Sequence, residues 1–178
     1  SINKAADHSK ILIDCQGPIS VPNNDNNLCI KAAKLIFQNY HINCGINICL
    51  VKNIPIGAGL GGGSSNAATI LCVLNDIFSL NISNHELHDL AFELGCDVPF
   101  FINGGIQISE GKGEILTKLS VDLSHYFILL VHPNFNVSTQ WAYSFFKNNL
   151  PKTFDCDKFR SFQDSLDWGL FENDFENI

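Results

Sequence analysis

The sequence contains no methionine and few basic residues, and the shortage of positive charge narrows the kinds of partner it can have. Lys and Arg number 11 against 18 Asp and Glu, so the net charge is −7 over 178 residues. Proteins that bind nucleic acid or an acidic membrane surface usually carry a basic face. The composition argues against both partners, although an anionic ligand can still bind through backbone N–H groups.

Membrane segments and metal-binding motifs are missing as well. The sequence has no run of 18 apolar residues and no signal peptide, which favours a cytoplasmic protein. Its seven cysteines form no CxxC pair and no Cys/His cluster with zinc spacing. We therefore expect buried, reduced thiols, and we identify no metal-ligating residues.

The most unusual feature that is present is a glycine cluster. Five glycines and two serines occupy the nine positions from Gly57 to Ser65. Fixing a glycine in regular structure costs about 0.5–1 kcal/mol relative to alanine, so a cluster of this density needs a physical reason. An alternating, β-branched segment precedes the cluster and an apolar-periodic helix follows it. The pattern predicts a loop between a strand and a helix that something must approach closely.

Two standard nucleotide motifs and a flexible linker are alternatives for this loop. Gly57-x-Gly59-x-x-Gly62 satisfies the dinucleotide fingerprint, but the acidic residue at the required distance, Asp76, falls within a helical pattern. A P-loop would need a lysine before Ser64. A linker would not be flanked so closely by a strand and an apolar helix with serine caps. A third type of phosphate loop remains, in which glycine N–H groups form an anion nest at the positive end of a helix.

Hydrophobic periodicity predicts strands and helices in mixed order, which indicates an α+β fold. Asp25 to Asn27 offer caps for one helix, and a capping box from Ser83 to Glu86 opens another that ends at Gly95. Asp97 is a candidate cap for a short helix. The predicted strands are residues 11–15, 45–51, 106–109, 115–119 and a fully buried strand at 126–131, and the other predicted helices are residues 28–40, 67–78 and 139–148.

The segment from Pro55 to Ala68 resembles the phosphate-binding motif of the GHMP kinases, a family that includes galactokinase, homoserine kinase and mevalonate kinase. A second segment, Leu-Gly-Cys-Asp-Val-Pro-Phe-Phe at 94–101, resembles the family segment that carries a catalytic aspartate. The similarity covers most of residues 20 to 145. It implies a ribosomal protein S5 domain 2-like α+β fold, with a GHMP kinase N-terminal, ATP-binding domain at residues 1–132 and the beginning of a second α+β domain at 133–178.

The resemblance also implies roles for single residues. Asp97 would be the catalytic carboxylate beside the acceptor hydroxyl, where positioning matters more than strong activation of the nucleophile. Asn27 and Lys52 would lie near the adenosine, and Thr139 and Tyr143 near a cytidine group. The residues that would wrap the ATP phosphates are Pro55, Ile56, Gly57, Ala58, Gly59, Leu60, Gly61, Gly62, Gly63, Ser64 and Ser65.

The implied reaction uses ATP and Mg²⁺ to phosphorylate the 2-hydroxyl of a methylerythritol unit that carries cytidine diphosphate, in non-mevalonate isoprenoid synthesis. Another GHMP-type small-molecule kinase and a non-catalytic nucleotide-binding module are the alternatives. Each residue also has a plain structural interpretation: Asp97 as a helix cap, Lys52 as a solvated charge and Tyr143 as a core aromatic. The pattern does not predict an oligomeric state.

Three motifs of the family have no counterpart in these residues. They are an N-terminal Pro-Ala-Lys-Leu-Asn-type segment whose lysine partners the aspartate, a Tyr-His pair that reads cytosine, and a late Thr-Gly-Thr-Gly-like loop. The chain begins Ser-Ile-Asn and ends in mid-pattern. We therefore expect a segment of a longer polypeptide that binds ATP weakly and does not turn over, because charge near Asp97 lacks its cationic partner.

Overall fold

The computed structural model describes residues 1–4, 10–133, 137–145 and 173–177. The chain divides into two compact units, one comprising Ser1–Gly104 and Ser109–Leu116 and the other Gly105–Ile108 and Thr117–Ile178. The first unit contains both the glycine cluster and Asp97.

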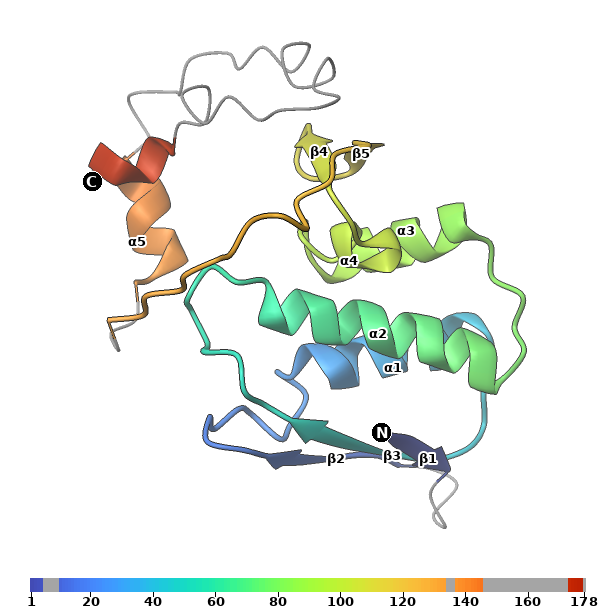
Figure 1. The fold of residues 1–178 in the computed structure, drawn as a ribbon. Helices are drawn as coiled ribbons and strands as arrows, with labels where there is room; N and C mark the ends of the chain where they lie inside the picture. Colours follow the sequence, from blue (N-terminus) through green and yellow to red (C-terminus); the bar gives the residue numbers. More distant parts are fainter. Residues whose placement is uncertain (5–9, 134–136, 146–172, 178) are drawn as a thin grey trace. The chain divides into compact units, whose positions relative to one another are not determined.

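A three-stranded sheet forms one side of the first unit, and helices cover one of its faces (Figure 1). Its strands are β1 (Ile2–Lys4), β2 (Ile11–Gln16) and β3 (Ile46–Val51), in the order β1-β3-β2. The central strand β3 is antiparallel to β1 and parallel to β2, with Ile13 opposite Ile48. A parallel pair needs a crossover connection, and the helix between β2 and β3 supplies it.

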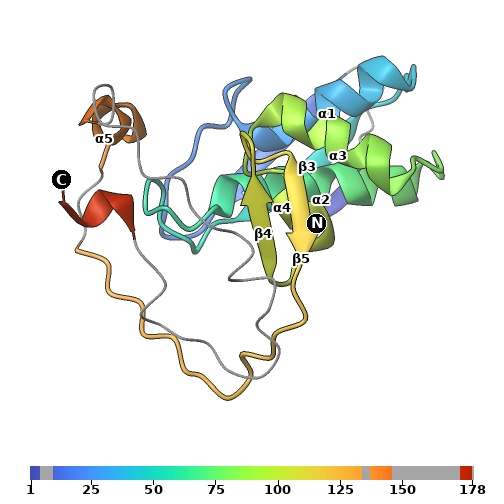
Figure 2. The same cartoon turned by 90° about the horizontal axis from the view of Figure 1, so that it is seen from above.

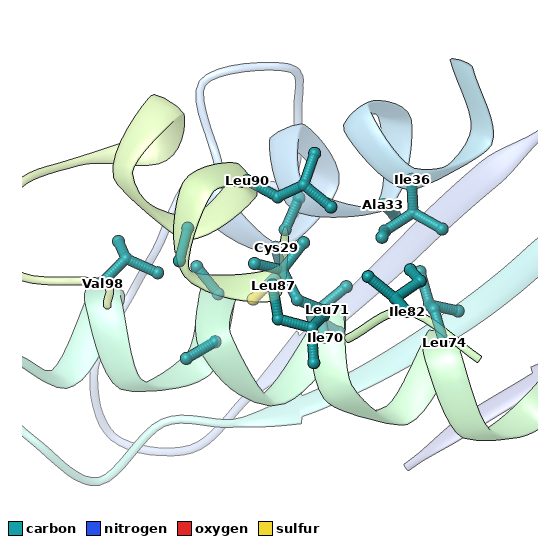
Figure 3. Packing of buried hydrophobic residues seen from close by; sticks show 14 of the residues in the cluster. Cys29, Ala33, Ile36, Ile70, Leu71, Leu74, Ile82, Leu87, Leu90 and Val98 are labelled. Atoms are coloured by element: carbon teal, nitrogen blue, oxygen red, sulfur yellow. The ribbon is translucent and has the colours of Figure 1, made fainter. Parts of the chain in front are cut away.

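Four helices complete the first unit. They are α1 (Leu28–Asn39), α2 (Gly62–Ile77), α3 (Asn84–Leu94) and the short α4 (Phe100–Asn103). Helices α1 and α2 form a layer between the sheet and the pair α3 and α4 (Figure 1). Their buried side chains interdigitate around Ile36, Leu71 and Leu74, which are fully buried (Figure 3). Each such residue contributes about 1.5–3 kcal/mol by leaving water, so this core holds α2 and its first turn in place.

The helix ends follow the sequence-based prediction at α1 and α3. The Asn27 side chain accepts a hydrogen bond from the Cys29 amide at the start of α1. The Ser83 hydroxyl accepts one from the Glu86 amide at the start of α3, and Gly95 ends that helix. The Glu86 carboxylate accepts a 2.6 Å hydrogen bond from the Tyr40 hydroxyl, which links α3 to the end of α1.

The predicted hairpin is present. Strands β4 (Gln107–Glu110) and β5 (Ile115–Lys118) run side by side in opposite directions (Figure 2). In the second unit the described residues also form α5 (Thr139–Ser144) and a 3₁₀ turn, η3 (Asp174–Asn177). The predicted helix 139–148 therefore begins as expected, and its last residues, 146–148, lie outside the described part of the chain.

The prediction of a buried strand at residues 126–131 is wrong. No strand forms there, and Phe127, Ile128 and Leu129 are 103%, 91% and 88% exposed. A strand needs hydrogen bonds to a neighbour, and none of the described strands pairs with this segment. Apolar composition alone therefore did not bury it.

Two predicted caps are also wrong. Helix α2 is capped by the backbone of Gly61 and has no side-chain cap, because its serines lie inside the first turn. Helix α4 begins after Pro99, so Asp97 lies in the preceding turn and caps nothing.

The described helices include none that is long and apolar enough to cross a bilayer. The six described cysteines are free thiols. Cys29 is buried, but Cys96 is exposed and the other four are half-buried, so the expected burial of the thiols is only partly correct.

Candidate active site

The glycine cluster forms an exposed loop that leads from β3 to α2. Gly57, Gly59 and Gly61 have φ angles of +70°, +69° and +62°. This left-handed region is costly for residues with a Cβ atom, so the alternation of glycines lets the chain turn tightly within a few residues. A Cβ atom on Gly59 would meet nothing within 4 Å. Glycine at position 59 therefore serves the backbone conformation and leaves the space beside the loop open.

The loop ends at a helix terminus with free hydrogen-bonding capacity. The first turn of α2, Gly62 to Ser65, receives no side-chain cap, whereas α1 and α3 are capped by Asn27 and Ser83. The first N–H groups of a helix have no partner within the helix, and they carry its partial positive charge. This end of α2 is therefore suited to bind an anion through the backbone.

Lys52 adds a formal charge at the same place. It is 5% exposed, and its Nζ would lie 2.7 Å from a Cβ atom on Gly62, the first residue of α2. Lys52 takes part in none of the ion pairs found among the described residues. Burial lowers the pKa of its ammonium from the usual 10.5. A buried cation beside a positive helix end is unfavourable unless an anion joins it.

A thiol borders this lysine, which sequence analysis did not anticipate. Burial raises the pKa of Cys29 to about 11, with a further contribution from Cys15, while the Lys52 charge acts in the opposite direction. The Cys29 thiol is therefore neutral near pH 7 and cannot neutralise the ammonium.

Asn27 has a structural role in this geometry. Its Oδ1 accepts from the Cys29 amide at 2.9 Å, and its Nδ2 donates to the Pro22 carbonyl at 2.6 Å. Both ends of the side-chain amide are thus engaged by the protein. A role near adenosine stays a prediction.

Asp97 is exposed in the turn between Gly95 and α4. Its neighbours Val98 and Pro99 are fully buried and anchor this turn in the core (Figure 3 labels Val98). Four residues further on, the ring of Phe101 lies against Gly61, where a Cβ atom would be 2.5 Å from Cζ. The aspartate segment and the glycine loop are therefore in direct contact through Phe101.

The hairpin turn supports the aspartate segment from another side. A Cβ atom on Gly113 would lie 2.5 Å from the carbonyl oxygen of Cys96, the residue before Asp97. The sequence placed Phe101 in the segment at 94–101 that resembles the family, but it assigned this residue no role. Gly113 lies between the predicted strands 106–109 and 115–119, and its contact with Cys96 was not anticipated.

The remaining candidates, Thr139 and Tyr143, lie on α5 in the second unit. Tyr143 is 61% exposed, and its ring packs edge-on against Phe175 with centroids 5.2 Å apart. It is therefore not the core aromatic of the structural interpretation. A role at a cytidine group stays a prediction for both residues.

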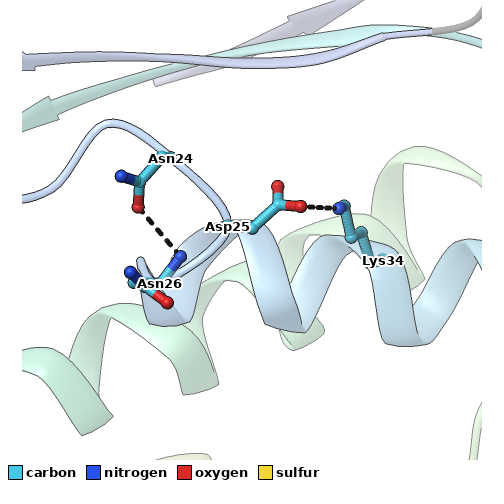
Figure 4. A network of polar contacts seen from close by, with 4 residues as sticks. All are labelled: Asn24, Asp25, Asn26 and Lys34. Carbon is cyan, nitrogen blue, oxygen red and sulfur yellow. Dashed lines mark hydrogen bonds and ion pairs between the residues drawn. The ribbon is translucent and has the colours of Figure 1, made fainter.

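A separate open cavity of about 590 Å³ lies beside β2 and α1, and none of its lining residues belongs to the glycine loop. Lys10, Lys34 and Phe37 contribute to its walls. Lys34 forms a 2.7 Å ion pair with Asp25, and the Asn24 side chain accepts from the Asn26 amide nearby (Figure 4). The Lys34 charge is therefore already balanced by the protein.

Comparison with known proteins indicates the class of protein that this chain resembles. Residues 27–105, which span α1, β3, the glycine loop, α2, α3 and α4, match the family model of the GHMP kinases N terminal domain. A crystal structure of homoserine kinase from Cytophaga hutchinsonii superposes with a TM-score of 0.64 over 89% of this chain and 52% of that chain, at 20% identity, which supports the fold alone. Residues 27–105 therefore have the fold of the GHMP kinase N-terminal domain.

Two other proteins have a higher sequence identity to this chain than the homoserine kinase has. Both are kinases of the same substrate. The 4-diphosphocytidyl-2-C-methyl-D-erythritol kinase of Prochlorococcus marinus (strain MIT 9215) is 52% identical over 125 residues, which are 70% of this chain and 40% of that protein. A crystal structure of 4-(cytidine 5'-diphospho)-2C-methyl-D-erythritol kinase matches with 34% identity and a TM-score of 0.55, covering 68% of this chain and 41% of that chain. The chain thus spans less than half the length of these two kinases.

Proposed function

We propose that this chain supplies the ATP-binding half of a kinase that phosphorylates the 2-hydroxyl of 4-diphosphocytidyl-2-C-methyl-D-erythritol. The substrate comes from the names of the similar kinases, and the chemistry comes from the site. One observation carries the proposal: an uncapped helix end, a left-handed glycine loop and a buried lysine that forms no ion pair with any described residue occur together. Such a place stabilises a triphosphate, which brings the missing negative charge.

The glycine loop would cradle the phosphates through the backbone from Pro55 to Ser65. Small residues let the phosphates approach the main chain, and the N–H groups of the first turn of α2 face developing negative charge. Lys52 contributes a cation that burial has already desolvated, so little reorganisation is needed when the nucleotide binds. The exposed side chains of Ile54, Ile56 and Leu60 offer apolar surface for the uncharged part of the nucleotide.

Asp97 would orient the acceptor hydroxyl and accept its proton. Phosphoryl transfer has a loose transition state, so the main requirement is that the attacking oxygen lies in line with the γ-phosphate. The exposure of Asp97 leaves its carboxylate accessible to a substrate, and the buried Val98 and Pro99 keep its backbone in position.

Mg²⁺ accompanies ATP in this proposal. It takes oxygen ligands and usually keeps several from phosphates and water. The described residues contain no group of three or more His, Cys, Asp or Glu side chains that could hold a metal ion, which fits an ion brought in by the nucleotide. The Ser64 and Ser65 hydroxyls at the start of α2 are the side-chain oxygen ligands that lie nearest in sequence to the glycines of the loop. When bound, Mg²⁺ would neutralise part of the phosphate charge.

We propose that the 178 residues alone bind ATP without appreciable turnover, because they include no lysine motif that would pair with Asp97. The experiment uses two proteins: this chain, and this chain joined to the flanking segments of the Prochlorococcus kinase. Calorimetry should show that both bind ATP with Mg²⁺. Only the joined protein should release ADP when 4-diphosphocytidyl-2-C-methyl-D-erythritol is added, and neither homoserine nor mevalonate should replace that substrate.

Asp97→Asn in the joined protein tests the catalytic group. We expect turnover to fall by about 10²–10³-fold with ATP affinity nearly unchanged. Asp89→Asn, which alters an exposed acid on α3, is the control and should have wild-type turnover. Unchanged turnover of Asp97→Asn would remove Asp97 from the mechanism. A cytoplasmic location and a small-molecule partner, with neither nucleic acid nor membrane, accompany this proposal.

A nucleotide-binding module without catalysis is the alternative function. It is favoured if the joined protein binds ATP but phosphorylates none of the three alcohols.

A further inference from the structure

The contact between Phe101 and Gly61 joins the two segments on which the proposed reaction depends. Gly61 is the N-cap of α2 and has φ +62° and ψ +13°, so it is the residue at which the loop becomes a helix. A Cβ atom on Gly61 would lie 2.5 Å from Cζ and 2.8 Å from Cε2 of Phe101. The tip of the ring is therefore packed on the backbone at the end of the loop.

The ring is itself held in place from behind. Phe101 packs against the buried core cluster, and its amide donates to the Val98 carbonyl at 3.1 Å. Phe100 meets the same ring edge-on, with centroids 5.1 Å apart. A side chain supported in this way transmits the position of the 97–99 turn to the loop, because packed aromatic contacts give way only at the cost of cavities or strain.

We infer that Phe101 is a positioning residue that holds the glycine loop in its phosphate-binding conformation and in register with Asp97. The inference rests on the proposed function of the loop. Phe101 touches the backbone of the loop, so it acts through Gly61 and the N–H groups that follow. Removal of the Phe101 ring should lower the affinity for phosphate. It should also uncouple the loop from the aspartate turn, even in a variant that still folds.

The experiment measures affinity and coupling in the 178-residue chain. Calorimetry gives the Kd of a non-hydrolysable ATP analogue with Mg²⁺, and amide NMR follows residues 57–63 and 96–98. In the wild type we expect the analogue to shift both groups of signals. In Phe101→Leu we expect the Kd to rise about tenfold or more and the response of residues 96–98 to disappear.

A matched control separates this effect from general destabilisation. Phe37→Leu makes the same change at a half-buried ring on α1 that packs edge-on against Phe78, with centroids 5.8 Å apart. This variant should lose thermal stability without changing the Kd or the coupling. Equal Kd values for Phe101→Leu and the wild type, or the same Kd increase in Phe37→Leu, would overturn the inference.

Two further variants test the direction of the contact. Phe101→Tyr keeps the ring but adds a hydroxyl at Cζ, the atom nearest to Gly61, so it should also weaken binding. Gly61→Ala should weaken binding strongly in the wild type and less in a Phe101→Ala background, where the ring is gone. A wild-type Kd for Phe101→Tyr, or strictly additive effects of Gly61→Ala and Phe101→Ala, would contradict the geometry.

The result also distinguishes the two proposals. If the wild-type chain does not bind the analogue, the proposed nucleotide site is wrong, and the role of Phe101 falls with it. If the wild type binds and Phe101→Leu binds equally well, the nucleotide site stands and only the role of Phe101 is wrong.

Discussion

The ammonium group of Lys52 lies against the first residue of α2, where a Cβ atom on Gly62 would be 2.7 Å from Nζ. The glycine at position 62 thus makes room for a cation from the protein itself. A buried charge of this kind lowers the stability of the free protein and favours binding of an anion.

Lys52→Met should therefore have opposite effects on stability and on binding. We expect the free energy of unfolding to rise by about 1 kcal/mol, because methionine fills similar space without desolvating a charge. We expect ATP affinity to fall by about tenfold or more. Thermal melts and calorimetry of the 178-residue chain measure both quantities.

The pH dependence gives a second measure of the same residue. Burial lowers the pKa of Lys52 from 10.5, so this amine binds its proton less tightly in the folded state than in the unfolded state. The wild type should gain stability relative to Lys52→Met as the pH rises toward 10.5. Lys31→Met on the exposed side of α1 is the control and should change neither stability nor affinity. A destabilised Lys52→Met with unchanged affinity would show that the lysine is only a packing element.

The Tyr40–Glu86 hydrogen bond should make the fold sensitive to alkaline pH. Burial and the Glu86 carboxylate raise the pKa of Tyr40 from 10.0 to about 12. The neutral phenol is the form favoured in the folded state, so this contribution is complete below pH 10.0 and is lost as the pH rises toward about 12.

The free energy of unfolding of Tyr40→Phe should be about 1 kcal/mol lower than that of the wild type near neutral pH. Its stability should then differ less and less from the wild type between pH 10 and 12. Denaturant titrations at several pH values measure this, and a double-mutant cycle with Glu86→Gln isolates the pair. A constant difference between Tyr40→Phe and the wild type across this range would contradict the assignment.

Asn27→Ala should affect stability more than binding. The substitution removes the helix cap of α1 and the donor to the Pro22 carbonyl. We therefore expect the free energy of unfolding to fall by about 2 kcal/mol. Asn27→Ser restores an acceptor for the Cys29 amide and should recover part of that loss. Chemical denaturation and ATP calorimetry test this together. A large fall in affinity with unchanged stability would instead favour direct contact between Asn27 and the nucleotide.

Gly113→Ala should destabilise the aspartate turn. Its Cβ would meet the Cys96 carbonyl at 2.5 Å, and φ at this residue is +115°. Gly111→Ala is the matched control, since φ there is +70° and the nearest group is the Glu114 carboxylate, a side chain that can move away. We expect a loss of about 2 kcal/mol or more for Gly113→Ala and about 1 kcal/mol for Gly111→Ala. Equal losses in thermal melts would contradict the contact with Cys96.

Much of the fold could be predicted from local patterns. The strand at 11–15, the helix from Leu28 and the hairpin at 107–118 are present within a residue or two of their predicted bounds. Local causes are visible for the helix from Leu28, which Asn27 caps, and for the hairpin, whose turn contains Gly111 and Gly113. The cap of α2 was wrong because a left-handed Gly61 leaves the serines inside the helix.

Local patterns failed to predict the structure of the segment 126–131. Its six apolar residues satisfy every local criterion for a buried strand, yet burial depends on a partner, and local sequence does not reveal whether one is present. Sequence likewise gave equal weight to Lys52 as a solvated charge and as a site residue. Its 5% exposure rules out the solvated charge, and its role in the site stays a prediction.

By itself, the sequence predicted a phosphate-binding loop and a resemblance to the GHMP kinases, because glycine spacing and helix caps act over a few residues. The tertiary structure decided which side chains meet that loop: the Lys52 ammonium at Gly62 and the Phe101 ring at Gly61. These contacts join residues 10 and 40 positions apart in the chain. They depend on how α2 and α4 pack over a shared core, a property that no local pattern encodes.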